Sequence, residues 1–168
     1  PEKAKKLLAE AGYPNGFEAT IKLPAIYPYA ARAGEVIADM LGQVGIKLNI
    51  EIVEWGVWLD RVFKQKDFQL SMIGHAEAWD IGIYSNPNYY FQYDSQEFRD
   101  AYAKALKAPN EAEKAKWFGR CQEIVAEDAV NGFLFLSPAL SAMKVELMDW
   151  WESYPTIAMD STKVWWKK

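Results

Sequence analysis

The stretch EVIADMLGQVGIKLNIEIVEW, residues 35–55, contains a helix pattern followed at once by a strand pattern. Its first part repeats apolar residues on one face of a helix predicted over residues 32–44: Val36, Ile37, Met40, Leu41 and Val44. Gly45 ends that helix. Its second part alternates, as is typical of a strand, over residues 46–55 with one apolar side: Ile46, Leu48, Ile50 and Ile52. A helix that leads directly into a strand indicates an α/β fold.

Two further strand patterns flank this stretch. FEATIKLP, residues 17–24, alternates, and FQLSMIG, residues 68–74, reads as the next strand. Residues 25–31 form a predicted loop that carries Tyr27 and Tyr29. A short helix before the last strand groups its apolar residues at helical spacing: Trp58, Leu59, Val62 and Phe63. The order strand-helix-strand-helix-strand predicts right-handed crossovers and an α/β fold with a mixed, largely parallel sheet and flanking helices.

The second half of the chain begins with two predicted helices. Ser95 is a good N-cap for a helix over residues 96–107. Asn110 caps the next helix, and Glu113 completes a capping-box-like arrangement. Cys121 lies on the apolar stripe of that helix and has no evident basic partner, so we expect a buried hydrophobic residue rather than a nucleophile.

The C-terminal part has weaker patterns. Residues 130–145 contain one or two predicted strands, broken near Pro138. Residues 146–168 are predicted to be an irregular tail, and its paired tryptophans suggest packing against another surface: Trp150, Trp151, Trp165 and Trp166.

Composition and charge exclude several classes of protein. The 168 residues have a net charge of −4 and no basic run, so the chain lacks the electrostatic signature of nucleic-acid binding. No apolar stretch is long enough to span a membrane. The single cysteine excludes an internal disulfide and a cysteine-based zinc site. The chain starts at a proline inside a helix pattern, so we expect it to be a segment of a longer polypeptide that could carry a signal peptide upstream.

Candidate site residues follow the ends of the predicted strands. Ligands of open α/β sheets bind beyond the carboxyl ends of the strands, where Trp55 and Trp79 lie. The stretch GHAEAWDIGIYSNPNYYFQYD, residues 74–94, also holds the only histidine, His75, and many aromatic residues. Packing is the alternative for both tryptophans, and we expect packing for at least half of the aromatic residues that follow: Tyr84, Tyr89, Tyr90, Phe91 and Tyr93. Packing is favoured for Trp58, which also lies on the apolar stripe of its helix.

Two carboxylates in this stretch, Glu77 and Asp80, leave catalysis open. They could form an acid–base pair of the glycosidase type, contact a ligand, or be solvated or capping residues. His75 could make a structural hydrogen bond or contact a ligand; without a second histidine or a cysteine at ligand spacing, it is a weak signal for metal. The absence of the GxGxxG, P-loop, GxSxG and HExxH motifs counts against an enzyme.

Three blocks of the sequence carry a family resemblance. PEKAKKLLAEAGYPNGF, EVIADMLGQVGIKLNIEIVEWGVWLDRV and DFQLSMIGHAEAWD, in this order, resemble the C-terminal lobe of family 5 extracellular solute-binding proteins. These are the peptide, opine and nickel type of substrate-binding proteins of ABC transporters. The resemblance implies one lobe of a type II periplasmic-binding-protein-like fold over residues 1–145. It also implies that residues 146–168 return to the other lobe, which is absent from this chain.

The family implies capture of a solute rather than chemistry. Its members close two lobes on a small-molecule or peptide ligand outside the cytoplasm, in the periplasm or at the cell surface, and deliver it to a membrane permease. No cofactor or metal is implied, because His75 does not match the histidine of the nickel branch. A glycoside hydrolase and a protein-interaction module remain the alternatives.

The resemblance also assigns roles to the candidate residues. Asp80 best matches the acidic residue that pairs with the ligand's α-amino group in the peptide branch, although the proline that follows it there comes only at Pro87 here. We therefore expect a peptide-like or other polar organic ligand. The tryptophans would offer apolar faces, and Glu77 would assist Asp80 in balancing a cationic group. Arg32 would meet a ligand carboxylate, with an ordinary surface arginine as the alternative.

Overall fold

The computed structural model describes residues 1–75, 80–136, 140, 142–151 and 160–167. The chain divides into two compact units, Pro1–Gly74 and His75–Lys168. Each unit has a hydrophobic core of its own.

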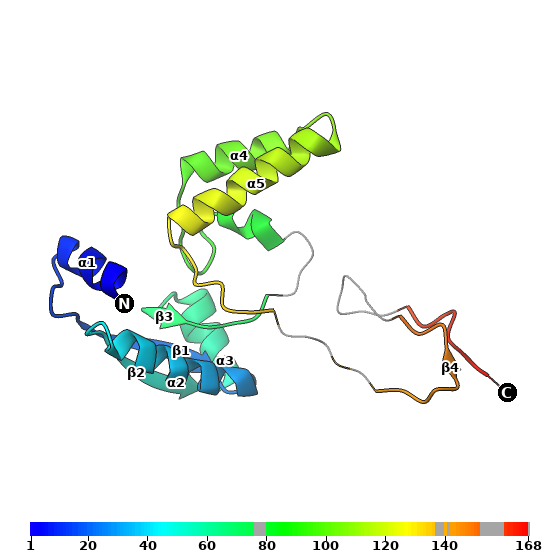
Figure 1. Ribbon diagram of the computed structural model, residues 1–168, viewed down its shortest axis with the longest axis horizontal. Helices are drawn as coiled ribbons and strands as arrows, with labels where there is room; N and C mark the ends of the chain where they lie inside the picture. Colours follow the sequence, from blue (N-terminus) through cyan, green and yellow to red (C-terminus); the bar gives the residue numbers. More distant parts are fainter. Residues whose placement is uncertain (76–79, 137–139, 141, 152–159, 168) are drawn as a thin grey trace. The chain divides into compact units, whose positions relative to one another are not determined.

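A parallel sheet forms the centre of the first unit (Figure 1). Its strands are β1 (Glu18–Pro24), β2 (Lys47–Val53) and β3 (Leu70–Ser71), in the order β2-β1-β3. β1 and β2 pair in parallel over their whole length, from Glu18↔Lys47 to Pro24↔Val53. The predicted parallel pairing of the strands is confirmed. The third strand is shorter than the predicted 68–74, because only Leu70 and Ser71 pair with β1.

The helices of the first unit are α1 (Glu2–Glu10), α2 (Pro28–Gly42) and α3 (Trp55–Trp58), which continues as a π-helix, η1 (Leu59–Lys64). α2 begins at Pro28 rather than at the predicted Arg32. Proline favours the first position of a helix, because its fixed φ suits the helix and it has no backbone N–H to leave unpaired. Much of the predicted loop over residues 25–31 is therefore the first turn of α2.

The core of the first unit lies between α2 and the sheet. Its buried members come from β1, α2 and the residue after β3: Ile21, Leu23, Ala30 and Met72. Gly34 lets α2 approach β1 closely, since a Cβ there would lie 2.5 Å from a methyl carbon of Leu23. Two residues that the helical pattern placed on the inner face, Val36 and Met40, are exposed instead. The buried residues of α2 are the small Ala30 and Gly34.

Two glycines fix the turns at the amino ends of β1 and β2. Gly16 precedes β1 and Gly45 precedes β2, with φ angles of +74° and +92°. A Cβ on Gly16 would lie 1.9 Å from the carbonyl oxygen of Gly45, so the two turns touch through their backbones. Only glycine fits this contact, because both the backbone conformation and the space exclude a side chain.

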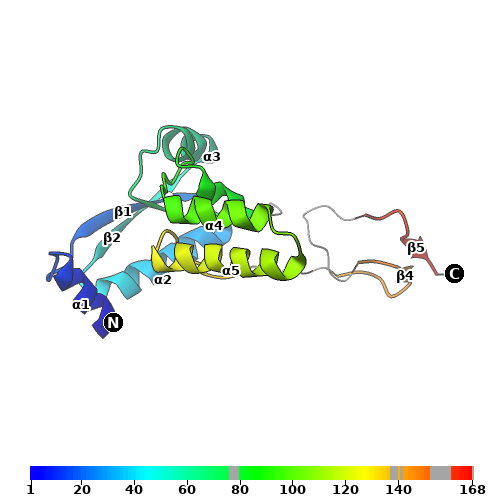
Figure 2. The same ribbon diagram turned by 90° about the horizontal axis from the view of Figure 1, so that it is seen from above.

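The second unit contains a 3-10 helix, η2 (Asp80–Ser85), and two α-helices that lie side by side, α4 (Gln96–Leu106) and α5 (Glu111–Glu127) (Figure 2). Both predicted N-caps are confirmed. The Ser95 hydroxyl accepts a hydrogen bond from the backbone N–H of Phe98, and the Asn110 side chain accepts one from Glu113 at 2.9 Å. These caps satisfy backbone donors that the first turn of a helix leaves unpaired.

The core of the second unit joins η2 to the helix pair. Its buried side chains are Tyr84, Phe98, Ala101, Cys121, Ile124 and Val125. The Cys121 thiol is fully buried, and this burial raises its pKa. The prediction that Cys121 is a buried hydrophobic residue is confirmed, since a thiol in this environment stays protonated and unreactive.

The strands predicted over residues 130–145 are wrong in the part that the structure describes, where 130–136, 140 and 142–145 are irregular. Pro138 lies outside the described residues. Leu136, Leu140 and Val145 are almost wholly exposed, and a strand forms only where it has a neighbour to pair with.

A short antiparallel ribbon lies in the predicted tail. β4 (Leu147–Met148) pairs with β5 (Trp165–Trp166), and the indole N–H of Trp165 donates to Asp149 at 2.7 Å. The tail is therefore less irregular than predicted. Among the described residues, no helix combines the length and the apolar character needed to cross a membrane.

Candidate ligand-binding site

An aromatic cluster lies at the carboxyl edge of the sheet in the first unit. β1 ends at Pro24 and leads to Tyr27 and Tyr29, while β2 ends at Val53 shortly before Trp55. Tyr27 stacks on Tyr29 with ring centres 5.4 Å apart and meets the Trp55 ring edge to face at 6.1 Å. These rings come together because the carboxyl ends of parallel strands share one edge of the sheet.

Trp58 supports this cluster from the core. Its ring stacks on Trp55 at 5.1 Å, and the residue is only 1% exposed. Its indole N–H donates to the Ser71 hydroxyl at 2.9 Å, and that hydroxyl donates to the Lys22 carbonyl at 2.7 Å. The packing role of Trp58 is confirmed. Trp55 is partly exposed, so it presents a ring that is held from behind by a fixed partner.

Tyr29 links the start of α2 to the end of the first unit. Burial raises the pKa of its hydroxyl, and a backbone hydrogen bond with Gly74 opposes that rise. A Cβ on Gly74 would lie 3.0 Å from this hydroxyl, so a side chain there would crowd it. The cluster is thus held from both α2 and the segment after β3.

In the second unit, His75 and Asp80 contact each other. The His75 Nδ1 lies 3.1 Å from Asp80 Oδ2, and both side chains are 26% exposed. The other ring nitrogen, Nε2, lies 3.4 Å from the Tyr90 hydroxyl. The His75 imidazole therefore lies between the Asp80 carboxylate and the Tyr90 phenol and contacts both.

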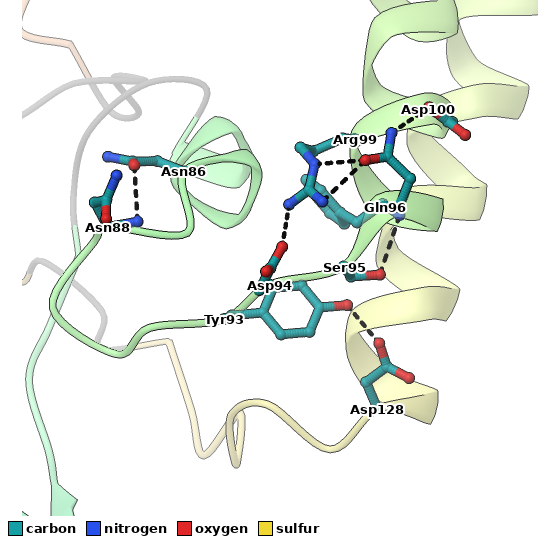
Figure 3. A network of polar contacts seen from close by, with 10 residues as sticks. Asn86, Asn88, Tyr93, Asp94, Ser95, Gln96, Arg99, Asp100 and Asp128 are labelled. Atoms are coloured by element: carbon teal, nitrogen blue, oxygen red, sulfur yellow. Dashed lines mark hydrogen bonds and ion pairs between the residues drawn. The ribbon is translucent and has the colours of Figure 1, made fainter.

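The aromatic residues after position 83 are mainly structural. Tyr84 and Tyr90 are buried, and this burial raises the pKa of both hydroxyls. The Asn131 amide donates to the Tyr84 hydroxyl. The Tyr93 hydroxyl donates to Asp128 just past α5 (Figure 3). The prediction that at least half of these aromatic residues pack is confirmed by Tyr84, Tyr90 and the half-buried Phe91 and Tyr93.

Polar contacts also hold the segment between these tyrosines and α4. The Asn86 side chain accepts from the backbone N–H of Asn88, which closes a local turn. The Arg99 guanidinium donates to Asp94 at 2.5 Å and to Gln96 at 3.0 Å (Figure 3). The segment is thereby fixed to the first turns of α4.

The predicted site residues fall in different parts of the chain. His75 and Asp80 are in contact in the second unit, whereas Trp55 belongs to the aromatic cluster of the first unit. Arg32 is exposed on α2, and no contact between Arg32 and Trp55 is found in the described part of the first unit. Glu77 and Trp79 lie outside the described residues. Ligand contact by any of these residues stays a prediction.

Sequence reasoning did not assign Tyr27, Tyr29 or Tyr90 to the site. Tyr27 and Tyr29 come shortly after a strand end, which is the signal that singled out Trp55. Tyr90 follows Asp80 through the 3-10 helix η2 and the turns after it, and no spacing in the sequence predicts its contact with His75.

A cavity in the second unit lies away from the predicted site residues, and the described residues contain no cluster of metal ligands. A cavity of about 490 Å³ on α4 and α5 has Lys104, Lys107 and Trp117 in its wall and includes none of the predicted site residues. Within the described residues, no three His, Cys, Asp or Glu side chains come together in a way that could hold a metal ion. The candidate site therefore offers a ligand aromatic ring faces, one carboxylate and hydrogen-bonding groups.

The sequence was compared with models of protein families. Residues 1–102 match the model described as bacterial extracellular solute-binding proteins, family 5 middle. The chain belongs to this family. The expected family resemblance is confirmed.

Similar proteins extend this result. The chain is 29% identical over 143 residues to heme-binding protein A of Haemophilus influenzae, covering 77% of this chain and 26% of that protein. It is 25% identical over 171 residues to the glutathione-binding protein GsiB of Escherichia coli K12, covering 90% of this chain and 33% of GsiB. The chain thus spans between a quarter and a third of the length of these relatives.

Solved structures show the fold of this family 5 chain. The periplasmic binding protein DppA of Helicobacter pylori, in complex with the peptide STSA, matches with a TM-score of 0.65 and 29% identity, over 77% of this chain and 27% of DppA. The oligopeptide-binding protein AppA of Bacillus subtilis, in complex with a nonapeptide, matches with a TM-score of 0.68 and 21% identity, over 77% and 30%. The predicted fold class, part of a periplasmic-binding-protein-like α/β fold, is confirmed.

Proposed function

We propose that the full-length protein is the substrate-binding component of an ABC transporter. It captures a small organic solute outside the cytoplasm, in the periplasm or at the cell surface, and delivers it to a membrane permease. The observation that carries the proposal is the match of residues 1–102 to the family 5 solute-binding proteins. The aromatic cluster at the carboxyl edge of a parallel sheet supports it, because ligands of such sheets bind at that edge.

The side chains suggest the chemistry of the solute. Trp55 offers an aromatic face backed by the buried Trp58, which suits a flat or apolar part of a ligand. Asp80 offers a carboxylate, which suits a cationic or hydrogen-bond-donating group. The names of the relatives include binding proteins for peptides, glutathione and heme. A peptide-like or other polar organic ligand with both kinds of group fits this set.

The rest of the full-length protein completes the proposal. Residues 1–145 form the C-terminal lobe, and residues 146–168 return to an N-terminal lobe. Trp165 and Trp166 are 48% and 60% exposed, which is costly for large aromatic side chains and supports a partner surface for them. Closure of two lobes on the solute would exclude water from the contacts with the ligand.

We also propose that the protein does not catalyse a reaction on its solute. A glycoside hydrolase would need Asp80 and Glu77 to flank the scissile bond as an acid–base pair, whereas the family that residues 1–102 match is one of solute-binding proteins. Hydrolysis of any glycoside by the full-length protein, lost in Asp80→Asn, would contradict capture without chemistry. A stable protein complex in place of a small ligand would favour the interaction module.

Native mass spectrometry of the full-length protein tests the proposal. We expect a co-purified small molecule, and calorimetry with that molecule should show Trp55→Ala weakening binding by roughly 30-fold, as for the loss of an aromatic anchor. Tyr13→Ala is the matched control, since Tyr13 is an exposed aromatic residue of the same unit outside the cluster. Failure to detect any ligand, or equal affinities for the two variants, would contradict the proposal.

A further inference from the structure

We propose that His75 is a positioning residue: with Tyr90 behind it, His75 holds the Asp80 carboxylate in the orientation in which it meets the solute. This inference rests on the proposed function, because it assigns the device that prepares Asp80 for a ligand. His75 then acts through Asp80 and need not touch the solute itself.

The three side chains run from the core to the surface. Tyr90 is only 9% exposed, and its ring packs against Tyr89 and Phe91 with ring centres 5.1 Å apart in both cases. The His75 ring lies parallel to the Tyr90 ring, with an angle of 3° between their planes. His75 and Asp80 are each 26% exposed. A rigid inner residue thus supports two outer ones that reach solvent.

The contacts of His75 with Asp80 and Tyr90 define which of its two ring nitrogens carries the proton. A carboxylate only accepts hydrogen bonds, so the 3.1 Å contact requires the proton of a neutral His75 to be on Nδ1. Nε2 is then an acceptor, and the Tyr90 hydroxyl is the donor that faces it. Burial raises the pKa of Tyr90, which keeps this hydroxyl protonated. The Nδ1–H of His75 then donates to the Asp80 carboxylate, and this hydrogen bond restrains the orientation of that carboxylate.

The two distances indicate that the Asp80–His75 and Tyr90–His75 contacts differ in strength. The Asp80–His75 contact at 3.1 Å is within the range of a good hydrogen bond, and one partner is ionised. The Tyr90–His75 contact at 3.4 Å is long. Of the two contacts, the one between His75 and Asp80 is therefore the stronger, and Tyr90 contributes less by fixing the tautomer and the ring.

Holding Asp80 before the solute arrives favours binding. A carboxylate that is already oriented loses less side-chain freedom when a cationic group docks on it. The charges that face His75 in the described residues are those of Asp80 alone, with Tyr89 and Tyr90 as the other titratable neighbours. With neutral His75, the pair keeps one negative charge, which suits a cationic group of the solute.

Three substitutions of His75 in the full-length protein separate positioning from simple packing. His75→Asn keeps an amide donor near the place of Nδ1, His75→Gln puts its amide near the place of Nε2, and His75→Ala removes both. With the co-purified solute as probe, we expect calorimetry to show about tenfold weaker binding for the alanine and glutamine variants, and rescue to within about threefold of wild type by asparagine. Tyr90→Phe should weaken binding about two- to threefold, and Tyr13→Phe should leave it unchanged.

Nitrogen NMR of the histidine-labelled full-length protein gives a readout that packing does not move. The signals of His75, identified by their loss in His75→Asn, should report the Nδ1-protonated tautomer in wild type and in Tyr13→Phe. An Nε2-protonated ring overturns the inference. So does an asparagine variant that binds as weakly as the alanine variant while it unfolds at the wild-type temperature.

The result also separates this inference from the proposed function. If wild type binds no small molecule, the proposed function and this role of His75 fail together. If wild type binds its solute and His75→Ala binds equally well, only the positioning role fails.

Discussion

Trp58 is the residue on which the aromatic cluster rests. Its ring is 1% exposed, and its only polar atom is satisfied by the Ser71 hydroxyl. Ser71→Ala takes away the hydroxyl that accepts from this indole N–H, so we expect it to lower the free energy of unfolding by about 1–2 kcal/mol in urea titrations. Ser71→Thr keeps a hydroxyl and should stay close to wild type. Equal stability of the alanine variant and wild type would contradict this role of Ser71.

The contacts of Asp67 with Lys22 and Arg61 predict how the stability of the protein changes at acidic pH. A hydrogen bond from Lys22, and then the charge of Lys22, lower the pKa of Asp67 from its ordinary value of 3.8, and Arg61 lowers it further. Because the folded pKa is depressed, this contribution is present above 3.8 and is lost as pH falls through the folded pKa. Asp67→Asn should flatten the fall in urea midpoint on acidification. An unchanged pH profile would show that the pairs of Asp67 do not affect stability.

Among the elements, α5 depends on its N-cap residue, Asn110. Asn110 accepts a hydrogen bond from the N–H of Glu113 at 2.9 Å, and without it that donor would lose its partner. We expect Asn110→Ala to reduce the free energy of unfolding by about 1 kcal/mol, and Asn110→Ser to restore most of it. Urea titration of the three proteins measures both effects. A serine variant as unstable as the alanine variant would contradict the capping role.

Prediction from the sequence was least accurate at the ends of helices and strands. The pattern in residues 35–55 led correctly to α2 and β2 because the apolar residues recur at the helix and strand periods. Four of these apolar residues are nevertheless exposed: Val36, Met40, Ile50 and Ile52. The start of α2 was missed because Pro28 was taken as a loop residue, although proline is also favoured at the first position of a helix. Residues 130–145 are apolar enough for a strand, but pairing depends on a neighbour that a sequence pattern does not reveal.

At the scale of the whole molecule, the sequence led to part of the site. Trp55 was found from its position after a strand, since topology alone places such residues at one edge of a sheet. The contact of His75 with Asp80 and Tyr90 was not predictable, because no periodic spacing in the sequence relates these three residues. The buried Tyr84 and Tyr90 show why the aromatic residues were ambiguous: the same side chains suit a core and a ligand surface.

The chain spans between a quarter and a third of the relatives, so the decisive structure is that of the full-length protein. Crystals grown with the co-purified solute would show directly what Trp55 and Asp80 contact. We predict an apolar or flat part of the solute in van der Waals contact with the Trp55 ring, and a donor group of the solute hydrogen-bonded to Asp80. A solute bound away from both residues, with Trp55 covered by protein and Asp80 paired to His75 alone, would contradict the proposed site.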